Sequence, residues 1–384
     1  MIKQYYKQAL AQLRQHPLIS IIGIVGTALS IFLIMLVVMM QQVKVAPFSP
    51  ESNRNRFLHV HYMSISHKDW GNGTSNGPMS VQTAREVYKS LKTPEAVTVY
   101  CCMTVSTPVS LPGAPAIGAD VRETDDTFFH VFDFQFTDGK PYDEATFTAG
   151  RPVAVITESI SRALFGSIQS VGKEFLLSHA PYRVVGVVKD VSTLADMAYG
   201  QVWIPFTSTN LSNDTWSDNH MGMMSVTLLA HDREDFDEIR AEAKRRMNEY
   251  NSILADQGYT LIDRNRPYDQ ETQSISFAAN LEPDLKAARR ERVIIFIILL
   301  LVPAINLSSM TQSRLRQRVA EIGVRRAFGS TRIEMVGQIV MENLVITLLA
   351  GAIGLLISIL FAYWGTDILF AQPYSCLLYT SDAA

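Results

Sequence analysis

The sequence predicts a membrane protein whose α-helical transmembrane part carries a large α+β extracytoplasmic domain between its first and second spans. Hydrophobic residues make up 47% of the 384-residue chain and charged residues 18%. The apolar residues concentrate in three blocks, each long enough to cross a bilayer as a helix. Between the first and second blocks, residues 41–288 alternate loosely between strand and helix patterns.

The first block is an uncharged run over residues 18–40. As a helix it would extend about 34 Å at 1.5 Å per residue, against a hydrocarbon core of roughly 30 Å. A cleaved signal peptide is the alternative, but the run is too long for its apolar core and no small-residue cleavage motif follows. We therefore predict a first transmembrane helix over residues 17–40.

The second and third blocks cover residues 293–310, which include Pro303, and residues 344–364, which include Gly351 and Gly354. Their alternative is a very hydrophobic helix buried in a soluble core. Their apolar length favours the membrane, where proline and glycine are tolerated within helices. The predicted spans are residues 289–310 and 343–364.

Residues 1–16 form a short amphipathic segment before the first span. Its apolar residues follow helical spacing, and Pro17 then breaks the pattern. This pattern predicts a helix in the membrane interface, with packing against protein as the alternative. The apolar residues are Ile2, Tyr5, Tyr6, Ala9, Leu10 and Leu13, and the basic residues off this stripe are Lys3, Lys7 and Arg14.

Positive charge next to the spans predicts the orientation. Residues 311–342 carry six arginines against three glutamates, so this segment should be cytoplasmic, together with the basic N-terminus. Arg289, Arg290 and Arg292 point the other way, but they end a long domain, for which the charge rule is weak. Residues 41–288 are therefore expected outside the cytoplasm.

Within residues 41–288, short β-branched runs predict strands and longer periodic stretches predict helices. The expected strands are 153–157, 182–188, 202–206 and 225–229. The expected helices are 80–91, 158–165 ending at Gly166, and a longer one after His231 with the apolar stripe Phe236, Ile239, Ala243, Met247, Tyr250 and Leu254. Polar composition predicts loops over 71–77 and 263–273.

Residues 166–173 read G-S-I-Q-S-V-G-K and superficially resemble a phosphate-binding loop. Five residues rather than four separate the glycines, and Glu174 stands where a serine or threonine would bind magnesium. We interpret the segment as a helix end followed by a turn into a strand. No catalytic set of nucleophile and base is evident, so the sequence indicates no enzyme, and a membrane-bound hydrolase is disfavoured.

Histidines and cysteines offer two weak metal candidates. His59 and His61 alternate on one predicted strand, with His67 nearby. This arrangement suits two metal ligands or, as we expect, a polar solvated strand face. Cys101 and Cys102 are adjacent and cannot easily bridge each other, and no third ligand accompanies them. We therefore predict no metal site. The net charge of −3 argues against nucleic-acid binding.

The segment between the second and third spans is the most informative one. A basic helix is expected to end near Gly329, and Thr331 with Glu334 forms a T-x-x-E capping box that starts the next helix. The result would be a rigid, charged corner at the inner membrane surface. Anchoring of its arginines to anionic lipid is the alternative role.

The run E-I-G-V-R-R-A-F-G-S-T-R at residues 321–332 closely resembles the signature between the second and third spans of FtsX-like permeases. L-F-G at 164–166, V-G-K at 171–173 and Y-R-V-V-G-V-V at 182–188 resemble the MacB-type extracytoplasmic domain. By this resemblance, the segment that meets an ATPase contains Glu321, Arg325, Arg326, Gly329 and Arg332.

The resemblance implies a four-span permease subunit of an ABC transporter in the bacterial cytoplasmic (inner) membrane, for efflux or mechanotransmission. It implies a separate or fused ABC ATPase that binds ATP and Mg²⁺, a homodimer or paired permease, membrane lipid, and in some members a periplasmic adaptor. The alternative is a non-transporting envelope regulator of the FtsX type or a lipoprotein-release subunit. Residues 371–384 are expected to be a non-native tail that resembles translated sequencing adapter, with the fourth span missing.

Overall fold

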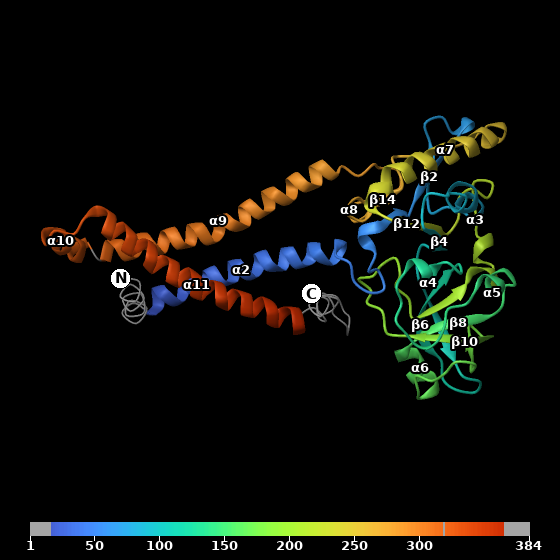
Figure 1. The fold of residues 1–384 in the computed structure, drawn as a ribbon, viewed down its shortest axis with the longest axis horizontal. Coiled ribbons are helices and arrows are strands. Elements are labelled where there is room, and N and C mark those ends of the chain that lie inside the picture. The colour runs from blue at the N-terminus through green and yellow to red at the C-terminus, as the bar shows by residue number, and fades with distance from the viewer. Residues whose placement is uncertain (1–16, 318, 365–384) are drawn as a thin grey trace. The chain divides into compact units, whose positions relative to one another are not determined.

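The computed structural model describes residues 17–317 and 319–364 (Figure 1). The chain divides into two compact units. One contains the described residues 17–42 and 286–364, and the other is the large domain Val43–Leu285. The predicted fold class is confirmed: an α-helical part accompanies a large domain of mixed helix and strand. The interfacial helix expected over residues 1–16 and the tail expected over 371–384 lie outside the described residues.

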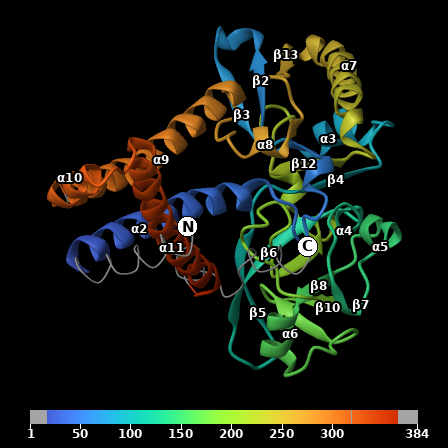
Figure 2. The same ribbon diagram turned by 60° about the vertical axis from the view of Figure 1, so that its left-hand side comes forward.

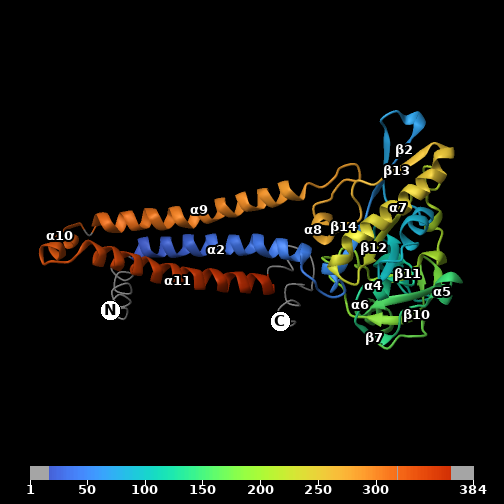
Figure 3. The same cartoon turned by 45° about the horizontal axis from the view of Figure 1, so that its top comes forward.

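The helical unit consists of long helices that run side by side (Figure 3). They are α2 (Pro17–Val45), α9 (Leu285–Gln317) and α11 (Arg332–Trp364), with the shorter α10 (Val319–Ala327) between the last two. Among the described residues, three helical segments are long and apolar enough to cross a membrane. Because α9 continues to Gln317 and α11 already begins at Arg332, most of the predicted cytoplasmic segment is helical.

Small residues bring these helices together. On α9, the Asn306 amide nitrogen lies 3.4 Å from the Gly23 carbonyl of α2, and a Cβ at Gly26 would lie 2.5 Å from that nitrogen. On α11, a Cβ at Gly354 would lie 2.8 Å from the Ala28 carbonyl. Helices approach this closely in membranes where glycines remove side-chain bulk.

The large domain is built mainly on β-structure. Its strands are β1 (Phe57–Val60), β2 (Met63–His67), β3 (Thr74–Gly77), β4 (Ala96–Cys101), β5 (Val105–Ser110), β6 (Ile117–Thr124), β7 (Phe136–Gly139), β8 (Val153–Thr157), β9 (Glu174–Leu177), β10 (Ala180–Val188), β11 (Val202–Pro205), β12 (Met224–Leu229), β13 (Tyr259–Ile262) and β14 (Tyr268–Asp269). Its helices are α3 (Val81–Ala84), α4 (Phe128–Val131), α5 (Glu144–Thr148), α6 (Glu158–Phe165), α7 (Phe236–Leu254) and α8 (Gln270–Gln273). In the described chain, eleven strands join one sheet, and β13-β2-β3 form another.

Six strands of the larger sheet close on themselves. The order β11-β8-β10-β9-β5-β6 returns to β11 because β6 and β11 pair in parallel, with Ile204 opposite Glu123. Strands β5, β6, β8 and β10 of this set lie together in Figure 2. The enclosed apolar core includes Val121, Phe175 and Val184. Closing a sheet into a barrel removes unpaired edges.

A second core lies between the antiparallel strands β4, β12 and β1 and the helices α3 and α7. One face of β1 contributes Leu58 and Val60 to this core. The predicted apolar stripe of α7 is confirmed, because all six of its residues are buried and line the same core. The large domain therefore buries apolar side chains both inside the barrel and beneath α7.

The predicted strands and helices are largely confirmed. β8 and α6 coincide with the predicted 153–157 and 158–165, and β10, β11 and β12 overlap the other predicted strands. The helix predicted over 80–91 is α3 continued by a π-helical turn, Arg85–Lys89. Residues 166–173 lead from α6 into β9, as interpreted.

Both predicted loops are wrong in part. Strand β3 occupies Thr74–Gly77 because it pairs with β2, and this tertiary pairing overrides a polar composition that disfavours strands. In the segment 263–273, β14 pairs with β1 and α8 follows it. The partner of β3 is the neighbouring strand of a hairpin and the partner of β14 is distant in sequence, so strand pairing rather than local composition decides the structure of both segments.

Candidate functional site

The helical corner of the first unit begins at a capped helix end. Gly329 has a φ of +95°, and its N–H donates to the Arg326 carbonyl while the Ser330 N–H donates to the Arg325 carbonyl. These two bonds make the Schellman motif that ends α10, in which glycine occupies the left-handed position. The predicted helix end at Gly329 is confirmed.

The next helix starts immediately with the predicted capping box. The Thr331 N–H donates to the Glu334 carboxylate at 3.0 Å, and the Glu334 N–H donates to the Thr331 hydroxyl at 3.3 Å. Hydrogen bonding from the Thr331 backbone lowers the pKa of Glu334. Two adjacent caps thus fix the backbone over residues 325–334.

The structure places the predicted contact residues around these caps. Arg325 donates to the Gln338 side chain of α11 at 2.8 Å and so links the two helices. Arg326, Gly329 and Arg332 are exposed. The backbone of Glu321 belongs to α10, but its side chain lies outside the described structure. The ATPase contact assigned to these five residues stays a prediction.

Two apolar side chains at the corner were not predicted as functional residues from the sequence. Phe328 is 88% exposed and Ile333 is 84% exposed, and they flank the Gly329 turn on either side. Such exposed apolar groups commonly mark interaction surfaces. The sequence contained one signal for this surface, because Phe328 follows Val324 by four residues and both apolar side chains are exposed at the end of α10.

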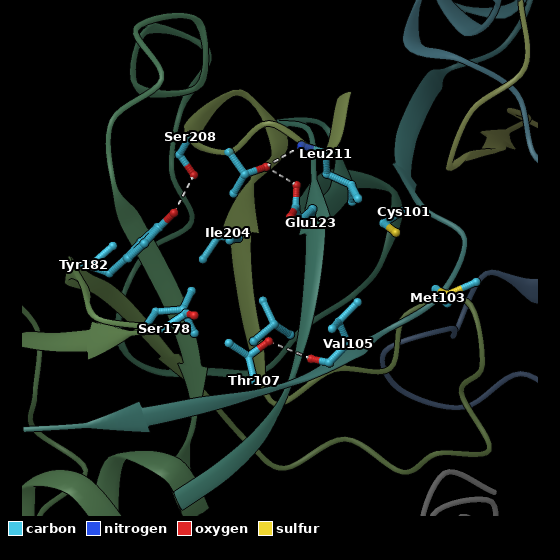
Figure 4. A pocket seen from close by; sticks show the side chains of 14 residues that line it. Cys101, Met103, Val105, Thr107, Glu123, Ser178, Tyr182, Ile204, Ser208 and Leu211 are labelled. Carbon is cyan, nitrogen blue, oxygen red and sulfur yellow. Dashed lines mark hydrogen bonds between the residues drawn. The ribbon is translucent and has the colours of Figure 1, made fainter. Parts of the chain in front are cut away.

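A second candidate site lies at the mouth of the barrel in the large domain. A cavity of about 460 Å³ opens there, lined by side chains from β5, β6, β9, β10 and β11 and from the residues after β11 (Figure 4). Val121 and Glu123 alternate with the buried Arg122 on β6, so both face the cavity. Ile204 of β11 lies beside Glu123 in register.

Glu123 is the carboxyl group of this cavity. The Thr209 hydroxyl donates to its Oε2 at 2.5 Å. Burial raises the pKa of Glu123 to about 7, and the Thr209 hydrogen bond opposes this rise. No sequence pattern marked Glu123, because its neighbours in the cavity come from strands far apart in the chain.

The sequence offered two candidate metal sites: the histidines around His59, and Cys101 with Cys102. The prediction of a polar, solvated strand face is wrong at His59, because this side chain is only 1% exposed. It forms hydrogen bonds through Nδ1 to Thr227 and through Nε2 to Gln270. Burial lowers the pKa of His59 to about 4. Cys101 and Cys102 are both free thiols. Within the described residues, no three His, Cys, Asp or Glu side chains lie close enough to hold a metal.

The three long apolar helices, the capped corner and the large domain of mixed helix and strand that follows the first of these helices define a membrane-type chain with one large inserted domain. Residues 18–246 match the family of MacB-like periplasmic core domains, and residues 293–381 match the FtsX-like permease C-terminal family. The chain belongs to the MacB-like periplasmic core domain family and carries the FtsX-like permease region. The family recognised in the sequence is thereby confirmed.

Curated relatives are distant in sequence. The uncharacterized ABC transporter permease YknZ of Bacillus subtilis is 22% identical over 244 residues, which cover 62% of this chain and 55% of the relative. The macrolide export ATP-binding/permease protein MacB of Burkholderia cenocepacia is 24% identical over 63% of this chain and 33% of the relative. The chain therefore spans about half of the first protein and a third of the second.

Solved structures give weaker matches. The periplasmic region of MacB from Actinobacillus actinomycetemcomitans covers 53% of this chain and 88% of its own, at 19% identity and a TM-score of 0.36. A domain of a putative permease from Porphyromonas gingivalis covers 62% of this chain and 97% of its own, at 14% identity and a TM-score of 0.40.

Proposed function

We propose that this chain is the permease subunit of an ABC transporter and that a partner ATPase binds the corner formed by α10, Gly329 and the start of α11. The observation that carries the proposal is the pair of adjacent caps, which hold exposed apolar and basic side chains on a fixed backbone. Aromatic and arginine side chains are enriched where proteins bind each other. A preorganised turn lowers the ordering cost of that contact.

We propose that this corner transmits the conformational change of the ATPase to the permease. Closure of two ATP-loaded ATPase domains would press on it, and α9 would carry the displacement toward Leu285, the last residue of the large domain. This helix runs unbroken through Pro303, so its backbone hydrogen bonds are satisfied within the segment apart from the one that proline lacks. Pro303 is the proposed flexing point.

The connection of α2 to the large domain also suits such coupling. The carbonyls of Val43, in the last turn of α2, and of Ala46, just after it, accept hydrogen bonds from the buried Arg54 side chain. Movement of α2 would therefore reach the domain through a fixed attachment. The large domain would then move relative to its mate in a homodimer or a pair of permeases, for efflux or mechanotransmission.

The remaining partners follow from this proposal. ATP and Mg²⁺ would bind to the ATPase, with no cofactor on this chain. The three apolar helices would lie among lipids of the bacterial cytoplasmic membrane, with the corner inside and the large domain outside. A periplasmic adaptor would be a further partner if the complex performs efflux, whereas its absence would favour an envelope regulator or lipoprotein-release subunit.

Reconstitution with the cognate ABC ATPase, sought first among adjacent genes, tests the contact. The double variant Arg325→Glu with Arg326→Glu should reduce co-purification of the ATPase and its stimulation by the permease about tenfold or more. The reason is that two negative charges would replace the positive charges proposed to attract the ATPase. Phe328→Ala should weaken the same contact by removing an apolar anchor.

Arg162→Glu is the matched control, since Arg162 is exposed on the large domain and pairs only with Glu158 among the described residues. It should leave assembly and ATP turnover as in the wild type. If the double variant also leaves both unchanged, the corner is not the ATPase contact.

A further inference from the structure

The barrel mouth of the large domain has the features of a ligand site, which the coupling role does not require. We propose that this cavity binds a small apolar molecule carrying an amine, with the Glu123 carboxylate as the partner of its ammonium group. The proposal stands on the cavity itself and does not depend on the ATP-driven coupling described above.

The walls of the cavity are suited to an apolar ligand. Val105 of β5, Val121 of β6, Leu177 of β9 and Ile204 of β11 contribute aliphatic side chains from four strands of the closed barrel. Small-molecule sites typically enclose about 300–1,000 Å³ with mostly apolar walls and few polar groups. The cavity of about 460 Å³ lies in that range, and the mouth of a barrel is a common place for such a site.

The Glu123 carboxyl supplies the polar group. In the described part of the chain, the Thr209 hydroxyl is its one hydrogen-bond donor, and no Lys or Arg forms an ion pair with it. A half-buried carboxylate without a cationic partner is unfavourable, which agrees with its raised pKa. A ligand ammonium would provide the missing charge and further donors.

Three neighbouring hydroxyl groups, those of Tyr182, Ser208 and Thr209, already donate their protons within the protein. Ser208 donates to the Pro205 carbonyl at 2.7 Å, so the Tyr182 hydroxyl is the donor in its 3.1 Å contact with Ser208. Thr209 gives its proton to Glu123 and accepts one from the Leu211 N–H. These hydroxyl oxygens can therefore only accept a hydrogen bond from a ligand, and Glu123 is the one charged side chain among the described residues that line the cavity (Figure 4). A cation should bind in preference to a neutral or anionic analogue.

Fluorescence titration of the detergent-solubilised full chain tests the site. The probe is dansylcadaverine, an apolar fluorophore with a primary amine, and the comparison is its neutral N-acetyl derivative, both at pH 8. The wild type should bind the amine saturably and about tenfold more tightly than the neutral probe. Glu123→Gln should abolish this preference by weakening amine binding about tenfold while leaving the neutral probe unchanged.

Two further variants locate the binding. Val105→Trp, at a half-exposed lining position, should fill the mouth and remove saturable binding of both probes. Glu174→Gln, an exposed glutamate of β9 that pairs with Arg183, should bind as the wild type does. The proposal is overturned if the wild type shows no saturable binding, if Glu123→Gln keeps the preference for the amine, or if Val105→Trp still binds.

Discussion

The Arg54 guanidinium donates a 2.6 Å hydrogen bond to the backbone carbonyl of Val43, in the last turn of α2. The same group reaches the Ala46 carbonyl at 3.1 Å and the Leu194 carbonyl at 2.9 Å. Glu51 lies 2.6 Å from the Arg54 Nε, and both side chains are almost fully buried. One guanidinium therefore ties the chain that leaves the helix to a distant loop of the large domain.

Replacement of Arg54 by leucine should destabilise the large domain by about 3–5 kcal/mol, because it leaves the Glu51 carboxylate buried without its cation. Three carbonyl oxygens would also lose their donor. Denaturant unfolding of the full chain, followed by tryptophan fluorescence to which the buried Trp203 contributes, measures the change.

Arg162→Leu provides the comparison for this variant. Its ion pair with Glu158 is largely solvent-exposed, so its loss should change the free energy of unfolding by less than about 1 kcal/mol. Equal effects of the two substitutions would show that the Arg54 cluster is not the attachment we describe.

Replacement of Gly329 by alanine should loosen the corner by about 1 kcal/mol, because a Cβ is disfavoured at a φ of +95°. Gly323→Ala on the preceding helix is the matched control. No atom lies within 4 Å of its added Cβ, so it should stabilise α10 by up to about 1 kcal/mol. Retention of the partner ATPase on the immobilised permease should fall in the first variant and hold or rise in the second.

Local sequence signals predicted much of this structure. The apolar stripe of α7, the Gly166 and Gly329 helix ends and the Thr331–Glu334 capping box all depend on residues within a few positions of one another. Each such signal is a steric or hydrogen-bonding preference of a short segment, so it survives whatever surrounds it.

The burial of His59 and the cavity around Glu123 could not be predicted in the same way. The partner of the His59 Nε2 is Gln270, and the strand beside Glu123 begins only at Val202. The parallel pairing of β6 with β11 closes the barrel, and periodicity alone does not reveal which strands pair. Alternation predicts which side chains share a face, whereas the elements that cover that face decide their burial.

Replacement of Gly354 by alanine should weaken the packing of α2 against α11. The new Cβ would lie 2.8 Å from the Ala28 carbonyl and 3.1 Å from the Ile31 Cβ, and overpacking of this kind costs about 1–3 kcal/mol. Gly337→Ala, on the same helix with no atom within 4 Å of its Cβ, should not weaken it. Thermal unfolding in detergent distinguishes the two variants. Equal melting temperatures for Gly354→Ala and Gly337→Ala would contradict the close approach of α2 and α11.

Acid should destabilise the large domain through His59. Burial lowers the pKa of His59 from 6.5 to about 4 in the folded protein, so the unfolded chain binds more protons between these values. The free energy of unfolding must then fall as the pH drops from 6.5 to 4, by about 1.4 kcal/mol per unit of pKa difference.

His59→Gln should flatten this part of the pH profile, because an amide can bond to Thr227 and Gln270 without binding a proton. His179→Gln, at an exposed position, is the matched control for the loss of a histidine. Since other groups titrate in the same range, the informative quantity is the difference between each variant and the wild type in denaturant unfolding at a series of pH values. Parallel profiles for wild type and His59→Gln would show that His59 is protonated equally easily in the folded and unfolded chain.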